Sequence, residues 1–147
     1  MVHTYFMSDR QWQASGTYHD GSGRTFDLTG QSVVTRGDDD WTLEASMEVL
    51  LKAPVKLFNR YTIHSTDFEH TLAWTSINPA LGELSGTFSI IGSYIISVYT
   101  SQDGTYSGSE TLMQIDENTY NNVGVAFHNG QRLSAWTALL RAKPVFA

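Results

Sequence analysis

Residues 118–143, near the end of the chain, restrict the fold more than any other stretch. They form two runs of alternating residues joined by His128, Asn129, Gly130 and Gln131. Asn-Gly is the pair most typical of a two-residue type I′ turn, because both positions need a positive φ and the turn matches the twist of the strands that it joins. Alternating runs that are long enough to be strands, on both sides of such a turn, predict a β-hairpin.

The rest of the chain repeats this pattern of short alternating runs separated by turn-forming residues. The runs that we expect to be strands are 10–18, 24–36, 41–51, 55–64, 69–77, 83–90, 93–100 and 105–115. The run 41–51 contains many helix-forming residues, but its apolar side chains recur at every second position, which favours a strand. Residues 1–8 are expected to be a loose lead-in, so that the ordered core of a single domain spans about 9–143.

About ten consecutive strands with short connections predict antiparallel neighbours. A strongly twisted sheet of that size curls or splits, and closure into a barrel removes its edges. We therefore expect an all-β fold with little or no helix, a single up-and-down antiparallel barrel of about 8–10 strands. Its interior would hold side chains or one small ligand. A two-sheet sandwich is the alternative, and it is less favoured because the sequence shows no long crossover connection.

Charge and composition exclude several classes of function. Nine Lys and Arg residues against 15 Asp and Glu give a net charge of −6. Phosphate binding needs clustered basic residues, and the six Arg are scattered, so we expect no nucleic-acid partner. No apolar run is long enough to cross a membrane, and the chain begins without a signal-peptide pattern. The absence of Cys fits a reducing compartment, so we expect a cytoplasmic protein; the sequence leaves a homodimer open.

Two residues near the chain ends give a family resemblance. Trp12 lies in the first run, QWQASGTY, and Arg141 ends the last, SAWTALLRA. With the strand count and order, they make the chain resemble the calycin superfamily, which comprises lipocalins, fatty-acid-binding proteins, avidins and nitrobindin-like barrels. The resemblance implies a barrel in which the early Trp packs under the late basic residue and closes one end, so both residues would be structural. The Gly-x-Trp order of lipocalins and a helical segment are missing from this sequence.

Two charged residues in the middle of strands are candidates for binding. If Arg60 points inward from the run 55–64, it needs a carboxylate partner, either a ligand or Glu110, because an unpaired buried charge is very costly. The other register leaves Arg60 outside and places Tyr61 inside. Glu110 shares a face with Tyr106, so the alternation allows it to be either an acid that points into the barrel or the partner of Arg60.

The five His residues give no clear cofactor site. His64 and His70 flank one turn, and with Asp67 or Glu69 they could hold a metal, since imidazole suits zinc, copper, iron and nickel. Their spacing matches no familiar zinc signature, so we expect no metal and no cofactor. Nitrobindin-like barrels bind haem through a His, so the resemblance leaves a haem-binding barrel as an alternative, although their motif is not recognisable around any His here.

Aromatic residues interleaved with Ser, Thr and Asn indicate an interior with a ligand cavity. The residues predicted to bind the ligand are Arg60, Tyr61, His64, Trp74, Tyr94, Glu110, Tyr120 and Trp136. The predicted function is the binding of a small apolar or amphipathic molecule inside the barrel. The alternatives are an enzyme of the cyclase or isomerase type, in which Glu110 or His64 acts as acid or base in the same cavity, and a filled barrel without a ligand.

Overall fold

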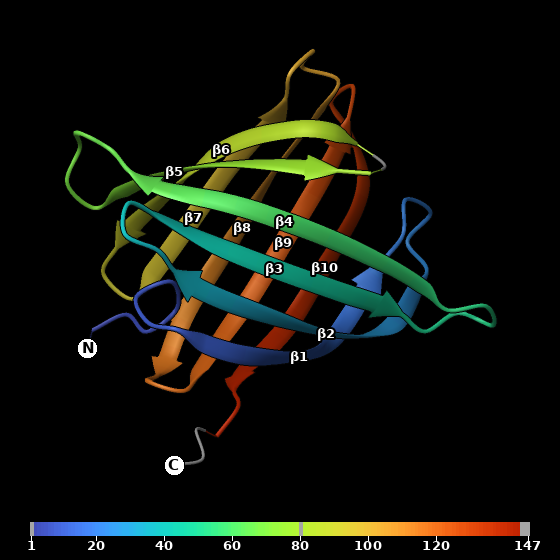
Figure 1. The fold of residues 1–147 in the computed structure, drawn as a ribbon. Helices are drawn as coiled ribbons and strands as arrows, with labels where there is room; N and C mark the ends of the chain where they lie inside the picture. Colours follow the sequence, from blue (N-terminus) through green and yellow to red (C-terminus); the bar gives the residue numbers. More distant parts are fainter. Residues whose placement is uncertain (1, 80, 145–147) are drawn as a thin grey trace.

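The computed structural model describes residues 2–79 and 81–144, and these form a closed antiparallel barrel of ten strands without a helix (Figure 1). The strands are β1 (Arg10–His19), β2 (Thr25–Arg36), β3 (Asp40–Val49), β4 (Val55–Ser65), β5 (Thr71–Asn78), β6 (Gly82–Ile91), β7 (Tyr94–Ser101), β8 (Tyr106–Asp116), β9 (Thr119–His128) and β10 (Gln131–Ala142). Each strand pairs with its neighbours in sequence, and β1 pairs with β10 to close the barrel. The predicted up-and-down barrel is thus confirmed. Within the described ranges no helix is long and apolar enough to span a membrane.

The final hairpin forms as its turn residues predict. Asn129 and Gly130 have φ values of 49° and 80°, and His128 pairs with Gln131 across the turn. Both central residues therefore have the positive φ of a type I′ turn. The run at 41–51, in which helix-forming residues compete with the alternation, is the strand β3. Its alternating burial shows that packing against the barrel interior overrides local helix propensity there.

Because successive strands run in opposite directions, the hairpin turns alternate between the two ends of the barrel. The turns β2–β3, β4–β5, β6–β7 and β8–β9 lie at one end, together with the N-terminal segment, residues 2–9; we call this the closed end (Figure 1). The other five hairpin turns lie at the opposite end, which we call the open end. Most of the buried apolar cluster, including Trp12, Phe88 and Tyr120, lies in the half of the barrel next to the closed end.

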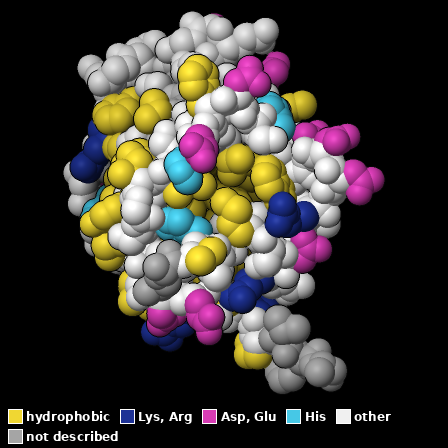
Figure 2. Space-filling view, turned by 90° about the vertical axis from the view of Figure 1, so that its left-hand side faces the viewer, with side chains coloured by type: hydrophobic (Ala, Val, Ile, Leu, Met, Phe, Trp, Pro, Cys, Tyr) yellow, Lys and Arg dark blue, Asp and Glu magenta, His cyan; other side chains and the backbone are white. Residues whose placement is uncertain are grey.

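The N-terminal segment belongs to the core, so the expectation of a loose lead-in is wrong. Tyr5 and Phe6 are buried, and the ring of Phe6 lies 4.5 Å from that of Phe88. The hydroxyl of Tyr120 on β9 accepts hydrogen bonds from the backbone N–H groups of Thr4 (3.0 Å) and Tyr5 (3.2 Å). The segment thus covers this end of the barrel. Figure 2 views the molecule from that side and shows apolar and His side chains gathered there.

Trp12 and Arg141 do not pack together as the family resemblance implies. Trp12 is fully buried, and its ring lies 5.1 Å from Tyr5 and 5.5 Å from Tyr120. Arg141 pairs with Gln13, the neighbour of Trp12, so its side chain lies outside and is exposed. The N-terminal segment and Tyr120 take the place that the resemblance gives to the late basic residue.

A basic residue does cover a tryptophan at the closed end, but on other strands. The guanidinium carbon of Arg36, the last residue of β2, lies 5.0 Å from the ring centre of Trp41 on β3. Arg36 also donates a hydrogen bond to the carbonyl of Met7 at 3.0 Å. A guanidinium at this distance from an aromatic face is attracted by the ring, so Arg36 links the N-terminal segment to the barrel wall.

Candidate functional site: the barrel interior

The interior is accessible in the middle and open part of the barrel. Several side chains there point inward and yet keep solvent-accessible surface: Tyr61, Tyr99, Tyr106, Glu110 and Trp136. Inward residues nearer the closed end, such as Ile63 and Ile95, have almost none. Water-sized molecules therefore reach the surface beside Glu110, whereas the closed half is filled by side chains.

Three aromatic rings lie flat against the inner wall because each faces a glycine on the next strand. The cross-strand pairs are Trp74 with Gly86, Tyr99 with Gly108, and Trp136 with Gly124. A Cβ atom added at any of these glycines would lie closer to the paired ring than real Cβ atoms approach other atoms. The glycines therefore let the rings cover the neighbouring backbone, so that Tyr99 and Trp136 line the interior with their faces and do not fill it.

A chain of hydrogen bonds crosses three neighbouring strands and ends on Glu110. The indole Nε1–H of Trp136 on β10 donates to Asn122 Oδ1 on β9 at 2.8 Å. The Nδ2 group of Asn122 donates to Glu110 Oε1 on β8 at 2.8 Å and to the carbonyl of Thr111 at 3.3 Å. Because the indole can only donate, the amide oxygen must face it and the amide NH₂ must face Glu110. The carboxyl oxygen Oε1 is thereby fixed as an acceptor.

The surroundings of Glu110 disfavour its charge. Burial raises the pKa of the Glu110 carboxyl, and the hydrogen bond from Asn122 opposes this only in part. The two ion pairs within residues 2–79 and 81–144, Arg24 with Asp20 and Arg60 with Glu44, involve residues outside the barrel interior. In this part of the chain Glu110 is thus a carboxyl without a cationic partner.

Phenol groups in three other parts of the fold lie near enough to this carboxyl for its charge to affect them. Burial, and secondarily the charge of Glu110, raises the pKa of Tyr99 on β7 to about 12 and that of Tyr61 on β4 well above its usual range. Burial likewise raises the pKa of Tyr5, whose hydroxyl lies 2.8 Å from Ser32 Oγ. These phenols are therefore uncharged at neutral pH and can donate hydrogen bonds. The interior offers one acid and several hydroxyl groups.

Five of the eight residues predicted to bind a ligand face the interior: Tyr61, Trp74, Glu110, Tyr120 and Trp136. Two of them already use their polar groups within the protein. Trp74 Nε1–H donates to Ser97 Oγ at 3.1 Å, and the Tyr120 hydroxyl holds the N-terminal segment. Contact of these five residues with a ligand stays a prediction.

Arg60, His64 and Tyr94 lie on the outer face of the barrel, so β4 has the register that leaves Arg60 outside and Tyr61 inside. On β4, Tyr61 and Ile63 point inward, and the alternation of the strand then turns Arg60 and His64 outward. The Arg60 side chain is 64% exposed, and its Nε lies 3.9 Å from Glu44 Oε1. On β7 the buried residue is Ile95, so the neighbouring Tyr94 lies outside and is 42% exposed. Arg60 is therefore not the partner of Glu110.

The sequence reasoning missed Asn122, and it did not place Tyr99 at the site. Neither residue belongs to a motif. The available signal was the pairing of a mid-strand glycine with an aromatic residue on the next strand, because Gly inside a strand often marks a close approach of another group. That signal depends on the strand register, and the turn at Asn129 and Gly130 does not give it alone, because a register shift between Arg132 and Ser134 brings Trp136 opposite Gly124.

The His residues form no metal site in the described part of the chain. No group of three or more His, Asp or Glu side chains there could hold a metal ion. His3 is buried at the closed end, where its Nδ1 lies 2.8 Å from the Tyr120 hydroxyl. His64 lies outside, and His128 is exposed at the rim of the open end, with its ring 4.9 Å from Tyr106. The described interior thus presents no buried His beside Glu110 that fits the haem alternative.

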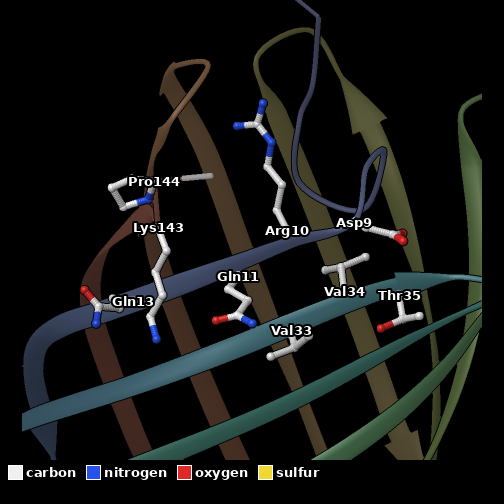
Figure 3. Close-up of a pocket in the computed structure, with 9 residues that line it drawn as sticks. All are labelled: Asp9, Arg10, Gln11, Gln13, Val33, Val34, Thr35, Lys143 and Pro144. Carbon is white, nitrogen blue, oxygen red and sulfur yellow. The ribbon is translucent and has the colours of Figure 1, made fainter. Parts of the chain in front are cut away.

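Two hollows lie outside the accessible interior. The first, of about 650 Å³, runs over the outer face of β1 and β2 and is lined by Asp9, Arg10, Gln11, Gln13, Val33, Val34, Thr35, Lys143 and Pro144 (Figure 3). Two of its charged residues have partners within the protein: Asp9 accepts from the Arg36 N–H at 2.8 Å, and Arg10 donates to the Glu117 carbonyl at 3.1 Å. The second, of about 430 Å³, lies over the closed end beside Val2 and His3. Neither contains Glu110.

Comparison with known proteins supports the fold. No protein family model and no curated protein matches the sequence. Among solved structures, an S-type phycobiliprotein lyase from Guillardia theta matches over 97% of this chain and 92% of its own, with 10% identity and a TM-score of 0.68. An N-terminal dehydratase from a difficidin assembly line covers 97% of this chain and 80% of its own at 8% identity, but its TM-score of 0.28 is too low to indicate a common fold. The chain therefore has a barrel similar to that of the lyase.

Proposed function

We propose that the barrel binds a small apolar or amphipathic molecule in its accessible interior, beside Glu110, and that the molecule enters from the open end. One observation supports this most strongly: an inward carboxyl without a cationic partner remains accessible between two flat aromatic rings. A barrel that only needed to be stable would gain by filling this space with apolar side chains, because burying a carboxyl costs free energy.

The surroundings of Glu110 suit a small ligand in other ways. Ring faces such as those of Tyr99 and Trp136 provide apolar contact area at little cost in entropy, and a few polar groups among them orient a ligand. A group with a shifted pKa inside a barrel is a typical feature of a binding or catalytic site. The similar fold of a phycobiliprotein lyase is compatible with this function, and assignment to the calycin superfamily is part of the same proposal.

Occupying the interior with a large side chain tests the proposal. Ala45 on β3 is half-buried and faces inward, whereas Thr137 on β10 is exposed and faces outward. We expect the wild-type protein to bind the neutral fluorescent probe N-phenyl-1-naphthylamine saturably. Ala45→Trp should weaken that binding by at least about tenfold, or 1.4 kcal/mol. Thr137→Trp, an insertion of the same size on the outside, should leave it unchanged.

The proposal fails if the probe shows no saturable binding, or if Ala45→Trp binds it as well as wild type does. Urea unfolding of both variants checks that the barrel is intact, since overpacking costs about 1–3 kcal/mol. Native mass spectrometry of the purified protein provides an independent readout, because a retained small molecule is released on denaturation and can be identified.

The raised pKa of the Glu110 carboxyl favours one second candidate, an enzyme of the cyclase or isomerase type. A carboxyl that keeps its proton closer to neutral pH is suited to general acid–base catalysis. In that case the same interior would fold a flexible substrate around Glu110, with positioning supplying most of the rate. The two candidates differ in whether the molecule that enters the barrel is returned unchanged.

A further inference from the structure

We infer that the ligand of this interior presents a nitrogen donor, an ammonium or N–H group on a planar aromatic body, to the Glu110 carboxyl, and that it is not an acid. The inference rests on the proposed function and adds the chemical class of the ligand. It follows from which groups face the interior and which do not.

The first argument is charge. In the accessible interior Glu110 is the acid, and Arg60, the cation that the sequence suggested for this place, lies outside beside Glu44. A ligand carboxylate would meet the Glu110 carboxyl without a cation to balance either charge, and two carboxyl groups at one site disfavour ionisation of both. A cation or a strong N–H donor gains from the same arrangement.

The second argument is hydrogen-bond geometry. The NH₂ group of Asn122 binds Glu110 Oε1 and thereby orients the carboxyl from the wall of the barrel. Within residues 2–79 and 81–144, no hydrogen bond to the other carboxyl oxygen, Oε2, is present. When Glu110 is ionised this oxygen is an acceptor and needs a donor. A ligand N–H group or ammonium supplies one.

The third argument is the shape of the lining. Tyr99 lies flat over Gly108, which is two residues before Glu110 on β8. Trp136 lies flat over Gly124, which is opposite Glu110 on β9. Flat rings offer faces for stacking to a planar ligand, and the same faces attract cations. A planar body that carries a nitrogen donor therefore satisfies the carboxyl and the rings together.

The titratable groups around Glu110 make the coupling to pH simple. The charge of Glu110 acts on Tyr61 from β4, Tyr99 from β7 and Tyr5 from the N-terminal segment, and all three phenols stay protonated at neutral pH. Glu110 is then the group whose charge responds to a ligand. An ammonium favours the ionised carboxyl and therefore lowers the pKa of Glu110 on binding.

Three ligands with one ring system and different head groups test the inference: 1-naphthylmethylamine, 1-naphthylmethanol and 1-naphthoic acid. Calorimetric titration at pH 7 should show the amine binding at least about tenfold more tightly than the alcohol, a difference of 1.4 kcal/mol, with the acid weakest. The affinity of the amine, unlike that of the alcohol, should fall as the pH is lowered, because protonation of Glu110 removes the charge that the ammonium meets.

Two variants with the same change of charge separate the role of Glu110 from a general effect. Glu110→Gln keeps an oxygen that can accept from Asn122 but removes the charge, so the amine should lose its preference over the alcohol. Glu44→Gln on the outer face should leave all three affinities unchanged.

The outcomes separate the inference from the proposed function. If the acid binds best, or if Glu110→Gln keeps the preference for the amine, the inference is wrong and binding inside the barrel still stands. If none of the three ligands binds and N-phenyl-1-naphthylamine does not bind either, the proposed function fails and the inference fails with it. If the three head-group ligands do not bind while N-phenyl-1-naphthylamine, itself an N–H donor, does, the Glu110→Gln variant decides: undiminished binding of that probe to the variant overturns the inference, and weakened binding supports it.

Discussion

Glu110 is a residue whose chemistry is set by its place in the barrel. Burial raises the pKa of its carboxyl, and the bond from Asn122 only partly compensates. A carboxyl with a raised folded-state pKa binds its proton more tightly in the folded than in the unfolded protein. Folding is therefore favoured most at low pH, below the unfolded pKa of Glu, and this contribution is lost as the pH rises through the folded pKa. Ionised Glu110 costs stability at neutral pH.

Glu110→Gln is expected to stabilise the protein at pH 7 and to have little effect at pH 4. Each unit by which the pKa is raised corresponds to about 1.4 kcal/mol, and each kcal/mol shifts the melting temperature of a domain of this size by roughly 2–4 °C. Calorimetric melting of wild type and variant at the two pH values measures the difference. Glu44→Gln, on the exposed surface, is the control. A variant that melts below wild type at pH 7 would show that the carboxylate stabilises the fold.

For single residues, the alternation along a strand predicts which side chains point inward only where its two faces differ in polarity. Alternation along β8 put Glu110 on the face of Tyr106, as either an inward acid or the partner of Arg60, and the structure has it inside without Arg60. Both faces of β4 contain aromatic or apolar residues, so the alternation there allowed two registers, and the choice depends on how Tyr61 packs against Trp74 from β5. The partnership of Glu110 with Asn122 needed the register between β8 and β9, which no local pattern in the sequence determines.

The N-terminal segment is the element whose role sequence reasoning missed. It shows no alternation and has few residues, so no periodicity indicates burial. Tyr5 and Phe6 become buried only when the end of a complete barrel is present to receive them. The strands, in contrast, were predictable because each has a strong local signal, alternation bounded by turn residues. Structure that depends on the assembled barrel is not visible in local patterns.

Tyr120 on β9 is the residue that attaches this segment. Its hydroxyl accepts from the N–H groups of Thr4 and Tyr5. His3 Nε2 lies 2.8 Å from the Gly92 carbonyl and therefore donates its proton there, so the Tyr120 hydroxyl donates to His3 Nδ1 at 2.8 Å. One phenol thus satisfies two backbone donors and one imidazole nitrogen.

Tyr120→Phe should lower the free energy of unfolding by about 3 kcal/mol, because buried groups that lose their partner each cost about 1–3 kcal/mol. Urea unfolding monitored by circular dichroism measures the change. Tyr94→Phe removes the same atom from an exposed side chain on the outer face and should cost less than about 0.5 kcal/mol. Equal costs for the two variants would mean that the segment does not depend on the Tyr120 hydroxyl.

At the scale of the whole molecule, the barrel combines a filled half with an accessible half. The N-terminal segment and the aromatic cluster around Trp12 fill the closed end, and the flat rings beside Glu110 leave the other half accessible. Such a division reconciles two demands on a small barrel: the closed half supplies buried apolar area for stability, while the open half keeps polar groups within reach of a ligand. In the proposed function, a ligand therefore enters from the open end.

The chain has no cysteine, so a single introduced thiol can report which end a ligand uses. Leu57 on β4 has the inward orientation of Tyr61 and lies two residues from the β3–β4 turn at the open end, whereas Phe68, 76% exposed, lies in the β4–β5 turn at the closed end. Each is replaced by Cys and labelled with fluorescein maleimide. The association rate of N-phenyl-1-naphthylamine, followed by stopped flow, should fall by about tenfold or more with the label at position 57, since obstructed access lowers the rate of association.

The label at position 68 should leave that rate within about a factor of two, because the closed end is already covered by the N-terminal segment and a further group there obstructs nothing. Unlabelled Leu57→Cys and Phe68→Cys proteins show whether the substitutions themselves matter. A rate that falls only with the label at position 68 would mean that the N-terminal segment opens to admit the ligand. The hydrogen bonds of the Tyr120 hydroxyl would then have to break during each entry, and Tyr120→Phe would accelerate association instead of only destabilising the fold.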